Sequence, residues 1–390
     1  MNRLLFGACA LRFLDSFVLI APFYTVMFAE NGLTPSQIGL ILASWSAVCL
    51  VLEVPSGLLA DRMSRRWLMA IAQLLRCLGF AVWIAFPGFW GFLIGLMLWG
   101  LKSATLSGAF EAALFDELKA LGRQSEYVRV FGRTQSARFA GLLAAALVAA
   151  PMSVLGYPVL IAVSVVGGVA AAASALLLPK APRAMSASGW NTLRHLKQGL
   201  REAASLPGVP SLLLFIASTQ AVVSALADYW QIFGQQVGLP KPGIALFVAA
   251  LAGSGVLAAS VAHRLHRLPP LALSLMIAVA GLCVILAGAV WQPWSVVLPV
   301  IYVAIFWSVD VNADARFQHA LRGETRATVA SLKGFVMQGG TVFLMLSFGL
   351  VAEAQSYRTA FMVSGALAVL IGLVFALASR YRPAPIGPRA

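Results

Sequence analysis

Long apolar runs separated by short polar intervals follow one another along the whole chain. At 1.5 Å per residue, about 20 apolar residues in a helix cross the roughly 30 Å of hydrocarbon in a bilayer. The pattern predicts helices of this kind near residues 4–29, 36–60, 67–87, 89–116, 135–152, 157–179, 210–236, 242–262, 269–290, 294–315, 327–352 and 357–379. The sequence therefore predicts an all-α membrane protein with 12 transmembrane helices.

The composition supports this interpretation. The 390 residues are 60% hydrophobic and only 11% charged, whereas soluble domains average about 25% charged. The first run carries Arg12 and Asp15 and has no small-residue cleavage site, so we expect a membrane span there and not a signal peptide. All four cysteines lie inside apolar runs without C-x-x-C spacing, which indicates small buried residues and no metal site.

The net charge of +14 is interpreted from the positions of the basic residues along the chain. If the N-terminus is cytoplasmic, most Lys and Arg residues fall in cytoplasmic segments, and the outside loops hold only Lys241 and Arg358. The positive-inside rule then predicts that both termini face the cytoplasm and that the number of spans is even. The positive charge thus indicates membrane topology, and we expect no nucleic-acid partner.

The interval between the second and third runs is short and strongly charged. Its key positions, in the pattern G-x-x-x-D-R-x-S-R-R, are Gly57, Asp61, Arg62, Ser64, Arg65 and Arg66. This pattern resembles the loop between helices 2 and 3 of the major facilitator superfamily of secondary transporters, with Ser64 in a position that the family fills with glycine. Two further stretches, 107–116 with 132–133 and 324–332, resemble one bacterial branch of that family. An ordinary positively charged cytoplasmic loop is the alternative interpretation.

The resemblance implies a fold and a mechanism. It implies two six-helix bundles, residues 1–180 and 210–390, joined by a cytoplasmic linker at 181–209, with a substrate site near the middle of the membrane. In the family the loop latches the two halves in the outward-open state. Asp61 and Arg65 match its acidic and basic positions, and Asp116 is the best-placed partner on helix 4. Candidate gating residues are Gly57, Asp61, Arg62, Arg65, Arg66, Glu111, Asp116 and Lys333.

Charged side chains inside the predicted spans are candidates for transport chemistry, because each costs about 2.5 to 3.5 kcal/mol at the centre of the bilayer. Asp15 lies near the middle of the first span and Asp228 on a polar stripe of the seventh, so both are candidate proton-coupling residues. The alternative for Asp15 is mutual neutralisation with Arg12, one turn away. We also expect Arg76 to pair with Glu53.

Polar and aromatic stripes occur on the first, fourth, seventh and tenth spans, the four that line the central cavity in the family. The candidate cavity residues are Arg12, Lys102, Trp99, Gln220, Ser224, Tyr302, Phe306 and Asp310. Aromatic residues along these stripes favour a partly apolar organic ligand, although the same spacing also serves ordinary packing. We expect Lys333 to pair with Asp310, which would make Asp310 a structural or gating acid.

We therefore expect a monomeric transporter of a small organic solute in the bacterial cytoplasmic membrane, coupled to protons, in contact with membrane lipids, and without a cofactor or metal. Export of lipophilic compounds is slightly favoured, and proton-driven import of an anionic metabolite or chelate is the alternative, because the family's exporter motif in helix 5 is absent. An intramembrane enzyme using Asp310 and Asp314 on Mg²⁺-pyrophosphate would need a second acidic cluster, which the sequence lacks. We expect no enzyme and no catalytic residues; a non-transporting receptor is the other alternative.

Overall fold

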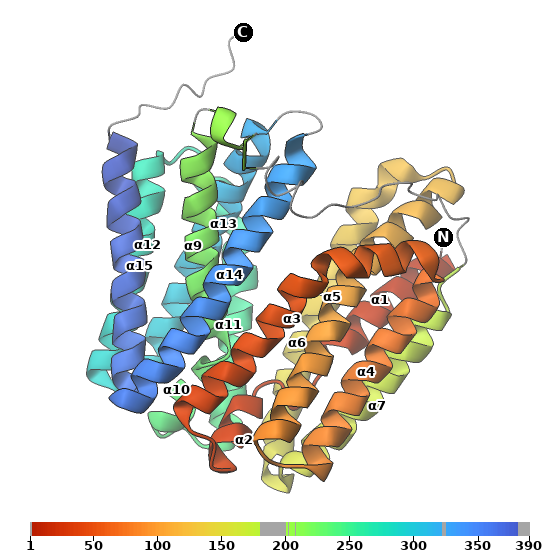
Figure 1. The fold of residues 1–390 in the computed structure, drawn as a ribbon, viewed down its shortest axis with the longest axis horizontal. Helices are drawn as coiled ribbons and strands as arrows, with labels where there is room; N and C mark the ends of the chain where they lie inside the picture. Colours follow the sequence, from red (N-terminus) through yellow and green to blue (C-terminus); the bar gives the residue numbers. More distant parts are fainter. Residues whose placement is uncertain (1, 180–199, 202, 207, 322–324, 381–390) are drawn as a thin grey trace. The chain divides into compact units, whose positions relative to one another are not determined.

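The fold is described from a computed structural model, and the description covers residues 2–179, 200–201, 203–206, 208–321 and 325–380. The regular structure of these residues is helical (Figure 1). Among them, eleven helices are long and apolar enough to cross a membrane. The first predicted span accounts for the difference from twelve, because it is divided into two short helices. The chain is therefore a multi-pass membrane protein.

The contacts between Cα atoms divide the chain into two compact units, one of 1–190 with 231–252 and one of 191–230 with 253–390. The helices from the N-terminal part of the chain are α1 (Asn2–Ser16), α2 (Tyr24–Glu30), α3 (Pro35–Arg62), α4 (Arg65–Ala85), α5 (Phe89–Ala120), α6 (Tyr127–Met152) and α7 (Tyr157–Leu176). The later helices are α9 (Val209–Ala227), α10 (Trp230–Gln236), α11 (Lys241–Val261), α12 (Pro270–Val290), α13 (Val297–Ala320), α14 (Thr325–Ala354) and α15 (Tyr357–Arg380). The predicted halves and their linker stay a prediction, and most of the linker lies outside the described residues.

Two of the predicted spans are interrupted. The first stops at Ser16 and resumes at Tyr24, and the turns between them contain Pro22, which cannot donate a backbone hydrogen bond and disfavours helix in the residue before it. The seventh stops at Ala227 and resumes at Trp230, although no proline is present. There the side chain of Tyr229 binds the Met345 carbonyl at 3.0 Å, so packing against α14 accompanies the break. Hydropathy identifies both spans but not these interruptions.

Glycines allow close helix contacts in each unit. On α4, a Cβ atom added at Gly79 would lie 2.6 Å from the carbonyl oxygen of Gly95 on α5. On α12, a Cβ added at Gly281 would lie 2.7 Å from the carbonyl oxygen of Gly365 on α15. Small residues at such positions let backbones approach and replace the hydrophobic driving force that is missing between helices in lipid. The resulting contacts hold α4 against α5, and α12 against α15.

Aromatic side chains fill the part of the first unit around Trp83. Its ring contacts those of Tyr24, Phe28, Phe80 and Trp99 at centroid distances of 5.2 to 6.3 Å. The rings meet edge-on, tilted or stacked, as aromatic pairs do in protein cores. This cluster links α2, α4 and α5.

Candidate functional site

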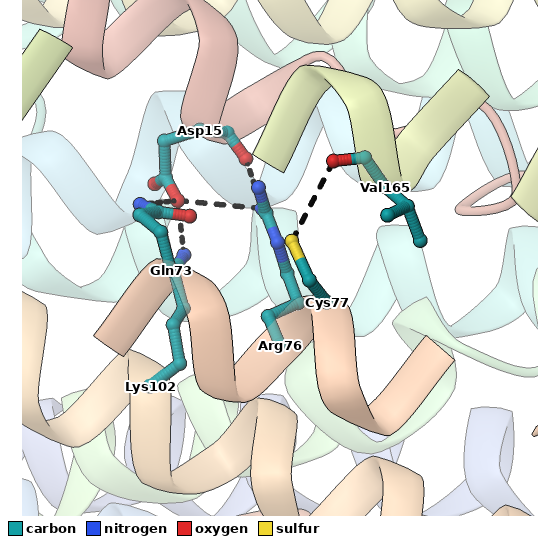
Figure 2. A network of polar contacts seen from close by, with 6 residues as sticks. All are labelled: Asp15, Gln73, Arg76, Cys77, Lys102 and Val165. Atoms are coloured by element: carbon teal, nitrogen blue, oxygen red, sulfur yellow. Dashed lines mark hydrogen bonds and ion pairs between the residues drawn. The ribbon is translucent and has the colours of Figure 1, made fainter. Parts of the chain in front are cut away.

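A buried polar network surrounds Asp15 at the end of α1 (Figure 2). The Asp15 carboxylate forms ion pairs with Lys102 of α5 and, at 3.4 Å, with Nη1 of Arg76 on α4. It also accepts a hydrogen bond of 2.8 Å from Nε2 of Gln73. Three helices thus converge on one carboxylate. Sequence reasoning nominated Asp15 and Lys102 but missed Gln73, whose spacing of one turn from Arg76 was the available signal.

Among the described residues, the network contains more positive than negative charge. Asp15 is 8% exposed, Lys102 5% and Arg76 0%, so two cations and one anion are almost completely removed from solvent. The Arg76 guanidinium also donates to the backbone carbonyl of Asp15 at 2.5 Å. Its Nε and Nη2 atoms, and Oε1 of Gln73, have no hydrogen-bond partner among the described residues. Buried groups of this kind are costly unless a further partner meets them.

Arg12 takes partners other than those the sequence suggests. Its guanidinium donates to Oε1 of Gln135 at 3.2 Å and lies 4.8 Å from the ring centroid of Phe110. The ion pairs of Asp15 are those with Lys102 and Arg76. Arg76 binds Asp15. The Glu53 side chain lies outside the described residues, so its pairing with Arg76 stays a prediction.

In the second unit, the acids of α13 separate into two environments. Lys333 of α14 binds Asp314 at 2.6 Å, so the expected pair of Lys333 with Asp310 is wrong. Asp310 instead accepts a hydrogen bond of 2.9 Å from Nε2 of Gln220 on α9. Asp310 and Asp314 are one helical turn apart, and the direction in which the lysine reaches decides between them. Hydropathy does not place a span precisely enough to choose between two acids that are one helical turn apart.

Other candidates from the stripes lie in less polar surroundings. Tyr302 and Phe306 are buried, the former 6.1 Å from the ring of Trp230 and the latter in the apolar core of the second unit. Ser224 is half-buried on α9, and half-buried Asp228 follows the last residue of that helix. Their roles in binding or proton coupling stay predictions.

The charged loop is described in part. The side chains of Gly57, Asp61 and Arg62 fall outside the described residues. Arg65 forms an ion pair with Asp116, which is the partner that the resemblance implies. These two residues line a cavity of about 250 Å³, together with Arg66, Glu117 and apolar side chains of α1, α4 and α5. Glu111 is exposed and lies before Asp116 on α5. The gating roles of these candidate residues stay predictions.

A second polar cluster, not foreseen from the sequence, lies at the end of α2 that is predicted to face outside. The Glu30 carboxylate accepts hydrogen bonds from Tyr157 at 2.7 Å, Lys241 at 3.0 Å and Gln235 at 3.3 Å. The Lys241 ammonium also lies 4.3 Å from the ring centroid of Tyr157. Nearby, Gln231 accepts a hydrogen bond of 2.8 Å from the hydroxyl of Thr25. We refer to the residues around Glu30 as the outer cluster.

The arrangement of long apolar helices with charged groups buried between them is that of a polytopic transporter. The Major Facilitator Superfamily model matches residues 5–343. The chain belongs to this family.

Relatives and solved structures agree with the family. The inner membrane transport protein YajR of Escherichia coli (strain K12) is 28% identical over 133 residues, which cover 34% of this chain and 27% of that protein. The nucleoside transporter NupG has a TM-score of 0.79 at 15% identity, over 98% of this chain and 100% of that one. A D-xylose-proton symporter has a TM-score of 0.75 at 15% identity, over 96% of each chain. At these identities the structures show a shared fold.

Proposed function

We propose that the protein is a proton-coupled secondary transporter that moves a small organic solute bearing an anionic group, with the network around Asp15 as part of its substrate site. It works by alternating access in the cytoplasmic membrane, with both termini inside. The proposal is supported by the buried excess of positive charge in the part of the chain that the structure describes, where Lys102 and Arg76 share the carboxylate of Asp15. Charged residues inside a membrane protein typically serve substrates or ions.

An anionic group suits this site for two physical reasons. The two unpartnered nitrogen atoms of Arg76 are strong donors, and a carboxylate or phosphate oxygen is their best acceptor. A bound anion would also balance the charge that Asp15 leaves uncompensated, which lowers the cost of keeping Lys102 and Arg76 out of water. Asp15 in turn keeps both cations in place when no anion is bound.

Export of a lipophilic compound is the competing function, and its support came from the aromatic stripes. In the structure, Trp99 packs against Tyr24, Phe80 and Trp83, while Tyr302 is 3% exposed. Packing thus accounts for these rings without a ligand. The buried donors of the charged network still need a hydrogen-bond acceptor, whereas the aromatic rings are already packed. This difference favours an anionic solute.

The test uses proteoliposomes with an imposed proton gradient and a panel of radiolabelled small carboxylates, sulfonates and phosphate monoesters. Neutral and cationic compounds of the same size form the comparison set. We expect transport of at least one anion, and a loss of about tenfold or more in Lys102→Met, since a hydrogen bond to a charged group contributes about 1.5 to 3 kcal/mol. Lys119→Met is the matched control, because Lys119 lies exposed on the same helix.

Two results of this transport assay would contradict the proposed function. It is wrong if neutral or cationic compounds are transported while every anion is refused. It is equally wrong if Lys102→Met transports an anion as fast as Lys119→Met does.

A further inference from the structure

Asp310 on α13 and Asp15 on α1 are both buried carboxylates, but their surroundings differ. We propose that Asp310, and not Asp15, carries the proton that is coupled to transport; this inference rests on the proposed function. Sequence reasoning gave Asp310 a structural or gating role because it expected Lys333 as its partner. The structure removes that reason, since Lys333 binds Asp314.

Asp310 and Asp314 lie on the same helix but in different surroundings. Asp314 is 36% exposed and has the Lys333 ammonium at 2.6 Å, so it can remain ionised at little cost. Asp310 is 8% exposed, and its one hydrogen bond among the described residues is the neutral amide of Gln220. Burying a carboxylate beside an amide and without an adjacent cation is costly, and a bound proton removes that cost.

Among the described residues, the elements around Asp310 offer it no counter-charge closer than Lys333. The helices α9 and α12, which pack against α13, contain no charged residue. The turn η3 (Ala262–Leu265) also packs against α13 and carries His263 and Arg264, but both are exposed. From α14, Lys333 acts on Asp310 through space only, because its ammonium is committed to Asp314.

The proton transfer can be written at named atoms. Oδ1 of Asp310 accepts the hydrogen bond of Gln220, and Oδ2 has no hydrogen-bond partner among the described residues. A proton from water on one side of the membrane would form the O–H bond at Oδ2 and leave later to water on the other side. Gln220 can keep its bond to Oδ1 throughout. The amide thus orients the carboxyl group in both protonation states and is a positioning residue.

Asp15 is less suited to this task. Its carboxylate faces Lys102, Arg76 and the amide of Gln73 at once. A proton there would cancel the one negative charge that the described residues supply to a network with two cations. The role left for Asp15 is to hold those cations, and the proton then belongs to the second unit.

Infrared spectroscopy of the purified full-length protein in lipid tests the proposal without any substrate. The carbonyl stretch of a protonated carboxylic acid is followed as pH is varied between about 5 and 9, the range of coupling groups with perturbed pKa values. We expect a titrating band in the wild type that is lost in Asp310→Asn and kept in Glu126→Gln, a control at a partly exposed acid of the first unit. Asp314→Asn is avoided because it would release Lys333. Asp310→Glu, which restores an acid at the same place, should retain a band.

The coupling role is tested in proteoliposomes loaded with a pH-sensitive dye and challenged with the anion panel. Anion-driven proton entry should be lost in Asp310→Asn and present in Glu126→Gln. The proposal is overturned if no band titrates, or if the band survives in Asp310→Asn and disappears in Asp15→Asn. A panel that drives no transport in the wild type would defeat the proposed function, whereas the infrared result would still decide which acid binds the proton.

Discussion

Replacing Asp15 by asparagine would leave the Lys102 ammonium buried without its anion. Arg76 would keep its 2.5 Å bond to the backbone carbonyl of residue 15, which the substitution does not alter. The cost therefore falls mainly on Lys102, which is 5% exposed. Removal of one partner of a buried ion pair costs about 3 to 5 kcal/mol, and the retained bond places the expected loss near about 3 kcal/mol.

The double variant separates the charge effect from other damage. Lys102→Met alone leaves Asp15 with Arg76 and Gln73, so we expect a loss of about 1.5 kcal/mol. If charge dominates, Asp15→Asn/Lys102→Met should lose only about 2 kcal/mol, well below the roughly 4.5 kcal/mol of two independent changes. The coupling energy would then be about 2.5 kcal/mol.

Thermal unfolding in detergent, followed by tryptophan fluorescence, measures the series. The midpoint of Asp15→Asn should fall by about 5 °C, and adding Lys102→Met should restore part of the loss. Because membrane proteins often unfold irreversibly, all variants are compared at one scan rate. Additive losses, or an Asp15→Asn variant as stable as the wild type, would refute the idea that the pair is strongly coupled.

Two further changes probe the outer cluster and the helix packing. Glu30→Gln removes the ion pair with Lys241, whose partners are about one third exposed; we expect at most about 1 kcal/mol of lost stability and a smaller dependence of the unfolding midpoint on salt. An unchanged salt dependence would contradict this. Gly281→Ala should destabilise by about 1 to 3 kcal/mol because its Cβ meets the backbone of α15. Gly253→Ala, with no atom within 4 Å, should be neutral when both are compared by fluorescence-detected size-exclusion chromatography.

Hydropathy was sufficient for most of the fold because a bilayer demands long apolar helices. The predicted run 67–87 became α4 (Arg65–Ala85), and 357–379 became α15 (Tyr357–Arg380). The breaks after Ser16 and Ala227 could not be predicted from hydropathy. Each break lies within a run that is apolar on average, so hydropathy averaged over the span does not show where the helix stops.

The partners inside the membrane were harder to predict than the charged residues themselves. Depth along a helix suggested Asp310 for Lys333, whereas the structure gives Asp314. It did not suggest Asp15 as a partner of Arg76. Adjacent turns differ by only about 5.4 Å, and helix tilt and rotation decide which side chain is reached. A sequence contains the charges but not these rotations.

The Arg76 guanidinium has a mechanical consequence. It binds both the carboxylate of Asp15 and the backbone carbonyl of the same residue, close to where α1 stops. The carbonyl end of a helix carries partial negative charge, so this attachment is electrostatic as well as directional. Rotation of α1 against α4 would have to break both bonds in a region without bulk water. Arg76 therefore ties the carbonyl end of α1 to α4, next to the irregular segment 17–23 that leads to α2.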